Sequence, residues 1–206
     1  ILYDYLQKQA SSTSKMQDFV DAQRLAYADR DHFFADPDWV DVPVAALLDQ
    51  TYLQRRAAAR FAPDALPEHG DPMGSVALGA DTTEEANGTT HLSIVDGEGN
   101  AVSFSATVES AFGSARWVRG LLLNNELTDL ARSYDAQMPM PANVTDGGKR
   151  PRSSMSPTMV FDESGELVLV TGSPGGNSIP AYVAKTILGI FDWQLTPQQA
   201  VDHPNI

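Results

Sequence analysis

The sequence predicts an α+β fold, because helical patterns near both ends of the chain enclose two predicted strand hairpins. Apolar side chains recur at helical spacing between residues 15 and 35, and a further helix is predicted from about 179 to 191. Residues 89–107 and 158–171 instead contain pairs of β-favouring runs joined by turn-forming residues. With 206 residues, 42% of them hydrophobic, the chain is long enough for a buried core.

The first half is predicted to contain two helices followed by a loop. Ser14 and Gln17 have the spacing of a capping box at the start of the first helix. This helix should end before Pro37, because the residue preceding a proline avoids helical geometry. Tyr52 to Arg60 is predicted to form a second, more exposed helix. Between residues 63 and 88 Pro, Gly, Asp, Glu and Thr occur without periodicity, which predicts a loop or mobile linker.

The second half begins with two predicted strands, residues 89–95 and 100–107, on either side of the turn-forming stretch Asp96 to Asn100. After the second hairpin and the helix that follows it, Thr196 and Pro197 predict the start of a short final helix.

Two acidic stretches resemble parts of metal sites. Asp81 to Glu85 has no His or further carboxylate at ligand spacing, which favours a solvated loop. Asp96 to Asn100 looks like the beginning of a calcium loop, but no Glu stands at the twelfth position, so a hairpin turn is favoured. Neither stretch therefore predicts a metal.

Composition narrows the class of function. The 27 acidic and 14 basic residues argue against binding to nucleic acid or to an anionic membrane surface. The absence of Cys excludes disulfides, zinc-thiolate sites and a Cys nucleophile, but leaves the compartment open. The longest apolar run, Ile179 to Phe191, is interrupted by Lys185 and falls short of the roughly 20 residues of a membrane span. No membrane segment is predicted in this chain.

A candidate nucleophile stands at the first predicted strand, where Gly88, Thr89, Thr90 and His91 follow one another. Cleavage of the Gly88–Thr89 bond would free the amine of Thr89, which titrates near ~8 and can take a proton from the hydroxyl of the same residue. A glycine before the cut lets the backbone reach the strained geometry of self-cleavage. Alternatively, the two threonines simply start a strand, where β-branched residues are favoured.

His91 invites comparison with a Ser-His-Asp triad, because Ser93 and Asp96 follow it closely. Three residues so near on one strand cannot converge as a triad does. A structural role for His91 is therefore favoured.

Further segments accompany this start in a fixed order. They are Ala26–Arg30, Asp36–Pro43, Leu121–Asp129, Lys149–Pro157 and Thr171–Gly176. Together with Gly88–His91 they make nearly the whole chain resemble the γ-glutamyltranspeptidase family. This resemblance implies the αββα four-layer sandwich of N-terminal nucleophile hydrolases, here only partly present.

The resemblance also implies a division of the chain. Residues 1–88 match the C-terminal part of a large subunit that ends in a processing linker, at about 63–88, and residues 89–206 match the N-terminal part of a small subunit. The chain is thus expected to be an internal fragment. Self-cleavage would give a heterodimer of large and small subunits, in the periplasm or outside the cell.

The implied catalytic residues are Thr89, Thr107, Gly175 and Gly176. Thr107 matches the hydroxyl that supports the nucleophile, although on its own it is an ordinary strand threonine. The glycine pair matches an oxyanion hole at a strand-to-helix turn. Taken alone, the glycines also fit a plain turn, whereas a phosphate-binding loop would need a Gly-Lys-Ser/Thr end that is missing here.

The implied substrate-binding residues fall into two groups. Ser153 and Ser154 match serines that bind the donor α-carboxylate, although alone they suit a Ser-rich loop. The residues that match the amide and acids holding the donor ammonium are Asn124, Glu126 and Asp129. Without the resemblance, the two acids would be interpreted as part of a solvated edge.

Glu109 departs from the family pattern, because Asn is usual at that position. We interpret it as a further acid for the donor ammonium, since a carboxylate beside the donor carboxylate would be unfavourable.

The resemblance implies γ-glutamyl transfer or hydrolysis on glutathione-like donors through an ester on Thr89. The acceptor would be an amino acid, a peptide or water, and no metal or organic cofactor is implied. The rivals within the superfamily are a glutaryl β-lactam acylase and a poly-γ-glutamate enzyme. From another class, the rival is a non-catalytic domain or an inert, unprocessed fragment.

Overall fold

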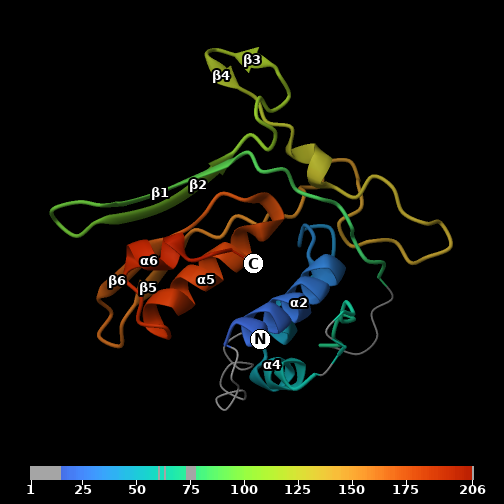
Figure 1. Cartoon of the computed structure of the whole chain (residues 1–206). Helices are drawn as coiled ribbons and strands as arrows, with labels where there is room; N and C mark the ends of the chain where they lie inside the picture. The colour runs from blue at the N-terminus through green and yellow to red at the C-terminus, as the bar shows by residue number, and fades with distance from the viewer. Residues whose placement is uncertain (1–14, 60, 63, 73–77, 206) are drawn as a thin grey trace. The chain divides into compact units, whose positions relative to one another are not determined.

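The computed structural model describes residues 15–59, 61–62, 64–72 and 78–205, and these divide into two compact units (Figure 1). The first unit combines residues 1–83 with 130–152, and the second combines 84–129 with 153–206. Each unit is thus built from two separate stretches of chain. The predicted division at residues 88 and 89 concerns a covalent cut and stays a prediction.

Helices dominate the first unit. α2 spans Lys15–Phe33, α3 spans Val44–Leu47 and α4 spans Gln50–Ala57. The first helix is confirmed, and it ends well before Pro37 as expected. α3 is too short for a periodic signal and was not predicted. Ser14 of the predicted capping box and Arg60 lie outside the described residues.

The second predicted helix is confirmed, but its description as exposed is wrong. Asp49 caps α4 by accepting the Tyr52 N–H at 2.9 Å. Tyr52, Arg56 and Ala57 are buried, because α4 packs on α2. Ala57 joins a core cluster with Ala22 and Leu25.

A buried ion pair ties α4 to α2. Asp29 is 3% exposed and forms an ion pair of 2.9 Å with Arg56, which is 8% exposed. Asp29 also accepts hydrogen bonds from the Tyr52 hydroxyl at 2.7 Å and from the Gly70 N–H at 2.7 Å. Burial and the bond to Asp29 raise the pKa of Tyr52 above its ordinary value, so its hydroxyl remains a donor.

The described residues of the predicted linker, 64–72 and 78–88, form no helix or strand longer than a single bridge, as predicted, but one acid among them is not solvated. Asp81 is 2% exposed and lies 3.3 Å from Arg152. It also accepts a 2.7 Å hydrogen bond from Asn143, and its N–H donates to the Asp31 carbonyl at 2.9 Å. The expected solvated loop is therefore wrong at Asp81, because distant residues bury and pair its charge.

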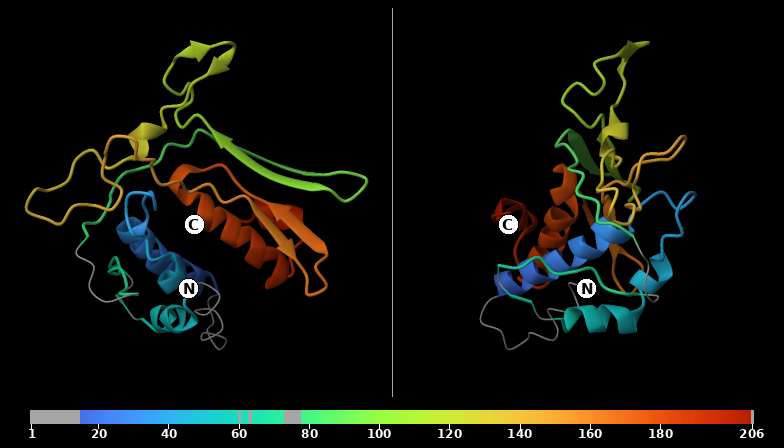
Figure 2. Two further views of the ribbon diagram at one scale, coloured as in Figure 1. Left: turned by 180° about the vertical axis from the view of Figure 1, so that it is seen from behind. Right: turned by 90° about the vertical axis from the view of Figure 1, so that its right-hand side faces the viewer.

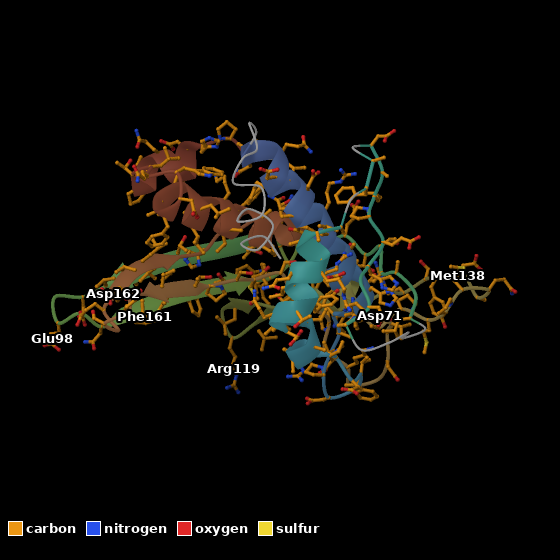
Figure 3. The ribbon with its side chains drawn as sticks, turned by 90° about the horizontal axis from the view of Figure 1, so that it is seen from below. Asp71, Glu98, Arg119, Met138, Phe161 and Asp162 are labelled. Carbon is orange, nitrogen blue, oxygen red and sulfur yellow. The ribbon has the colours of Figure 1, made fainter. Side chains whose placement is uncertain are left out.

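Two hairpins of the second unit confirm the predicted strands. β1 (Thr89–Val95) pairs antiparallel with β2 (Ala101–Thr107), and β5 (Thr158–Phe161) pairs with β6 (Leu167–Thr171). Asp96 accepts the N–H groups of Glu98 and Asn100 at 2.9 Å, which confirms the hairpin turn. Figure 3 shows Glu98 and Asp162 at the turns of the two hairpins.

The first hairpin has one polar and one apolar face. The polar face lies beside β6, where the Ser103 hydroxyl donates to the Thr171 carbonyl at 2.9 Å. The apolar face consists of two directly opposed pairs and is between 40% and 54% exposed: Leu92 with Phe104, and Ile94 with Val102. The described residues therefore leave one side of this hairpin uncovered.

The remaining elements of the second unit are short, apart from one helix. α5 (Ile179–Phe191) coincides with the predicted helix. α6 (Pro197–Asp202) begins with a capping box at Thr196 and packs beside α5 (Figure 2). Four elements were not predicted: β3 (Trp117–Val118), β4 (Leu121–Leu122), and the 3-10 turns η1 (Glu126–Asp129) and η2 (Gly176–Ser178). The mixture of helices and hairpins confirms the α+β class. No described helix is long and apolar enough to cross a membrane.

The buried Arg56–Asp29 pair predicts a large loss of stability when only one partner is removed. Arg56→Met should lower the free energy of unfolding by about 3–5 kcal/mol, because an uncompensated carboxylate stays buried. The double variant of Arg56→Met with Asp29→Asn should lose less of its free energy of unfolding, because no uncompensated charge remains. Arg55→Met, on the exposed neighbour, is the control. Urea unfolding of the four proteins measures the difference, and a loss below 1 kcal/mol for Arg56→Met would contradict the prediction.

Candidate active site

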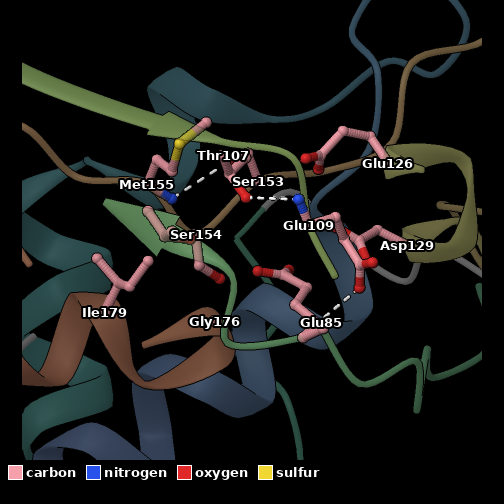
Figure 4. A pocket seen from close by; sticks show the side chains of 12 residues that line it. Glu85, Thr107, Glu109, Glu126, Asp129, Ser153, Ser154, Met155, Gly176 and Ile179 are labelled. Atoms are coloured by element: carbon pink, nitrogen blue, oxygen red, sulfur yellow. Dashed lines mark hydrogen bonds between the residues drawn. The ribbon is translucent and has the colours of Figure 1, made fainter. Parts of the chain in front are cut away.

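A pocket in the second unit brings together most of the predicted site residues (Figure 4). The predicted residues that line it are Thr89, Thr107, Glu109, Glu126, Asp129, Ser153, Ser154 and Gly176. Four more lining residues were not predicted: Glu85, Ala86, Met155 and Ile179. The first two stand just before the Gly88–Thr89 bond, in a stretch that the sequence showed only as a loop.

The two threonines come from facing strands. Thr89 opens β1 and Thr107 ends β2, and the register makes them direct partners. Directly opposed residues of an antiparallel pair point to the same face. The Thr107 hydroxyl oxygen accepts the Glu109 N–H at 2.8 Å, which orients it beside Thr89.

Of the two predicted glycines, Gly176 lines the pocket, whereas Gly175 precedes it in the same turn and lies outside the lining. Gly175 and Gly176 have φ values of 137° and 53°, a backbone region that side chains rarely adopt. A Cβ on Gly176 would lie 2.5 Å from the Glu85 carbonyl, and one on Gly175 would lie 2.7 Å from Tyr182. The glycines precede α5, and N–H groups at such a turn suit a negatively charged oxygen.

The two serines supply hydroxyls on a loop before β5. The Ser153 oxygen accepts the Met155 N–H at 3.2 Å, and Ser154 is 3% exposed. In Figure 4 the side chain of Ser154 points toward the carboxylate of Glu85. Hydroxyls placed in this way can donate to a carboxylate.

Four acids line the pocket: Glu85, Glu109, Glu126 and Asp129. We call the last three, which follow β2 in the sequence, the acidic wall. Burial and the charges of Glu85, Glu109 and Glu126 raise the pKa of Asp129 to about 7. Burial and the charge of Glu109 also raise the pKa of Glu126. Like charges held this close favour binding of a cation such as an ammonium group. Among the described residues no group of three or more His, Cys, Asp or Glu is arranged to hold a metal ion.

Glu109 accepts hydrogen bonds from several donors. Burial acts to raise its pKa, but hydrogen bonds from Ser110, Asn125 and Ala86 outweigh burial and hold the pKa below the ordinary value. Glu109 is therefore a carboxylate at neutral pH.

The structure places Asn125, and not the predicted Asn124, against the acids. Asn125 donates to Glu109 and, at 3.0 Å, to the Ser110 hydroxyl. The exposed Asn124 instead accepts the Glu126 N–H at 3.0 Å and lies outside the pocket lining. The doublet of asparagines was visible in the sequence, but which of the two faces inward depends on η1. The substrate-binding role of Asn124 stays a prediction.

His91 lies outside the pocket lining. Its two ring nitrogens are within hydrogen-bond distance of the Ser105 and Ser93 hydroxyls, at 2.9 and 3.0 Å, and its ring packs on Gly172. Asp96 is engaged in the hairpin turn. Burial lowers the pKa of His91, so the ring is neutral and serves the packing of β1 and β2, as the structural interpretation expects.

Comparison with known proteins places this arrangement in one family. The sequence profile described as Gamma-glutamyltranspeptidase matches residues 1–206. A glutathione hydrolase proenzyme of Escherichia coli (strain K12) is 35% identical over 204 residues, which are 94% of this chain and 33% of that protein. An acylase ACY 1 proenzyme of Pseudomonas sp. (strain SE83) is 30% identical over 198 residues, 95% of this chain and 33% of that protein.

The fold agrees with this assignment. The crystal structure of a mutant γ-glutamyltranspeptidase from Helicobacter pylori matches with a TM-score of 0.50 and 37% identity, over 56% of this chain and 66% of that one. The predicted sandwich of N-terminal nucleophile hydrolases, partly present, is thereby confirmed. The chain spans about a third of the length of the two curated relatives.

The pKa of Asp129 predicts a pH-dependent stability of the uncleaved protein. Because the folded-state pKa is about 7 and the ordinary value is 3.8, the folded state holds a proton that the unfolded state releases between these values. The stabilisation that this proton gives the folded state is complete below pH 3.8 and is lost as the pH rises through 7. Asp129→Asn should therefore raise Tm at pH 8 by roughly 2–4 °C, as expected for about 1 kcal/mol, and much less at pH 4.

The control for this prediction is Glu163→Gln, which removes one negative charge at an exposed turn. Scanning calorimetry at both pH values compares the two variants. An effect of Asp129→Asn that is equal at pH 4 and pH 8 would contradict the assignment of the raised pKa.

Proposed function

Because the chain belongs to the γ-glutamyltranspeptidase family, we propose that its protein cleaves itself at Gly88–Thr89 and then acts on γ-glutamyl donors through an ester on Thr89. The observation that carries this proposal is the pairing of Thr89 with Thr107 in a pocket that also holds two serines, a glycine turn and an acidic wall. The donors are glutathione-like compounds, and the acceptor is an amino acid, a peptide or water.

Self-cleavage begins with the Thr89 hydroxyl. Its oxygen attacks the Gly88 carbonyl carbon, the carbon–nitrogen bond breaks, and the hydroxyl proton ends on the released nitrogen. Water then hydrolyses the resulting ester. Gly88 gains a carboxylate and Thr89 recovers its hydroxyl together with a free amine. The Thr107 hydroxyl, opposite Thr89, supports this oxygen.

The mature enzyme repeats the chemistry on a donor. The Thr89 amine takes the hydroxyl proton as the oxygen attacks the γ-carbonyl of the donor. N–H groups of the Gly175–Gly176 turn bind the oxyanion of the tetrahedral intermediate. The leaving amine takes the proton away, and an acceptor amine or water then releases the γ-glutamyl group from Thr89.

The two charged groups on the α-carbon of the donor bind to different sides of the pocket. The hydroxyls of Ser153 and Ser154 donate to its α-carboxylate, and the acidic wall binds its α-ammonium. The raised pKa values of Glu126 and Asp129 support this arrangement, because a cation there relieves the repulsion between the acids.

After cleavage, residues 1–88 belong to a large subunit and 89–206 to a small one, and the two remain associated as a heterodimer. The glutathione hydrolase relative is called a proenzyme, which supports processing of this kind. A periplasmic or extracellular location is part of the same proposal.

A second candidate is acylase activity on glutaryl compounds, favoured by the relative named as an acylase. The acidic wall argues against it, because a glutaryl group lacks the ammonium that these carboxylates would bind. An inert fragment remains the alternative if this chain does not cleave.

The nucleophile is tested by Thr89→Ala, which should leave a folded, uncleaved protein because the attacking hydroxyl is gone. Thr90→Ala, at the exposed neighbouring position, should cleave normally. Intact-mass measurement of the full-length protein, with N-terminal sequencing of the fragments, distinguishes the two. Cleavage that persists in Thr89→Ala, or that occurs at another bond in the wild type, would show the assignment to be wrong.

Donor preference is tested with matched γ-glutamyl and glutaryl anilides. The γ-glutamyl compound should have the higher kcat/KM, because a glutaryl group leaves buried carboxylates without a partner. Glu109→Asn should bring the kcat/KM values for the two anilides closer together. Equal values in the wild type, or a preference for the glutaryl compound, would support the acylase alternative.

A further inference from the structure

The stretch that precedes the scissile bond, residues 84–88, is itself held in the pocket; we call it the pre-cleavage segment. Its Ala86 N–H donates to the Glu109 carboxylate, at 3.1 Å from Oε1. On the other side, a Cβ on Gly176 would lie 2.5 Å from the Glu85 carbonyl and 2.9 Å from the Ala86 carbonyl. The segment is thus enclosed between Glu109 and the glycine turn.

The backbone of Glu109 also approaches the scissile bond. A Cβ on Gly88 would lie 1.8 Å from the Glu109 carbonyl oxygen, so only glycine allows this approach. The Glu109 N–H donates to the Thr107 hydroxyl, which stands opposite Thr89. One residue therefore touches the segment before the cut and the hydroxyl beside the nucleophile.

The conformation of Glu109 is costly and is held in place by its side chain. Its φ of 71° lies in the left-handed region, which a residue with a side chain occupies at a cost. Its second carboxylate oxygen accepts from the Ser110 hydroxyl at 2.7 Å and from Asn125. Ser110 and Asn125 thereby fix the carboxylate, whose Oε1 accepts from the pre-cleavage segment.

The segment also resembles a donor in the groups that it presents. The Glu85 carboxylate points toward Ser154, where the proposed donor carboxylate would bind (Figure 4). The Ala86 N–H occupies Glu109 Oε1, where the proposed donor ammonium would bind. Glu109 is 5% exposed, and a buried carboxylate oxygen that loses its donor is unfavourable. When the segment leaves, this oxygen therefore favours a new N–H donor.

We propose that Glu109 is a positioning residue for self-cleavage, whose Oε1 holds the Ala86 N–H until the Gly88–Thr89 bond is broken and then passes to the ammonium of the donor. The inference rests on the proposed function. It adds that one carboxylate serves the two reactions in succession, first fixing the backbone before the scissile bond and later fixing the substrate.

The test measures the rate of cleavage in the full-length protein after cell-free synthesis, by intact mass. Glu109→Ala removes the acceptor and Ala86→Pro removes the donor, and each should slow cleavage by about 10- to 100-fold, the scale of losing one hydrogen bond to a charged group. The double variant should be no slower than the slower single one, because both remove the same contact. Glu109→Gln, which keeps an accepting oxygen, should cleave faster than Glu109→Ala.

The controls keep the contact. Ala86→Gly retains the N–H, and Glu84→Gln removes an exposed charge from the same segment; both should cleave within about twofold of wild type. Each variant is also made with Thr89→Ala, so that the Tm of the uncleaved form shows whether it folds. Matured Glu109→Gln should show a raised KM for a γ-glutamyl anilide with a smaller change in kcat, which a purely structural role would not produce.

Two results would overturn the proposal. Folded Glu109→Ala or Ala86→Pro that cleaves at the wild-type rate would show that the contact does not position the bond. If the double variant slowed cleavage by the product of the two single factors, the two residues would act independently. Cleavage in the Thr89→Ala background would instead defeat the proposed nucleophile, so the two failures are distinguishable.

Discussion

In the hairpin of β1 and β2, Thr89 stands opposite Thr107, and this register decides which side chains enter the pocket. Side chains alternate between the two faces of a strand, so a slip of one residue would turn Thr89 away and bring Thr90 in. The same register aligns Leu92 with Phe104 on the other face. A polar face that contributes to the pocket and an apolar face suited to another layer are thus specified together.

The pocket keeps charges that folding alone would not favour. Asp129 and Glu126 lie beside Glu109, which its own hydrogen-bond donors hold as a carboxylate. Elsewhere in the chain the buried acids Asp29 and Asp81 are paired with arginines. In the proposed function, the ammonium of a donor would relieve the repulsion between the acids of the pocket.

Elements with a local signal were predictable from the sequence. α5 and the hairpin of β1 and β2 follow their periodicity, and Thr89, Thr107 and Gly176, which the ordered motifs gave as candidates, line one pocket. Contacts between distant residues were not predictable. No local pattern shows that Arg152 pairs with Asp81 or that Ala86 donates to Glu109, because composition shows the stretch before Gly88 only as a loop. The choice between the two neighbouring asparagines likewise depends on a 3-10 turn without a periodic signal.

If the protein cleaves itself as proposed, the pairing of Asp81 with Arg152 limits which residues the cut can release. Asp81 is anchored in the first unit, and its carboxylate also accepts the Thr83 N–H at 2.9 Å, so the chain is fixed up to the start of the pre-cleavage segment. The five residues of that segment span at most about 17 Å when extended. A cut at Gly88 therefore frees a short tether and leaves the first unit intact. The contact between Ala86 and Glu109 lies within this tether, so it can be exchanged for a substrate while the ion pair with Arg152 stays in place.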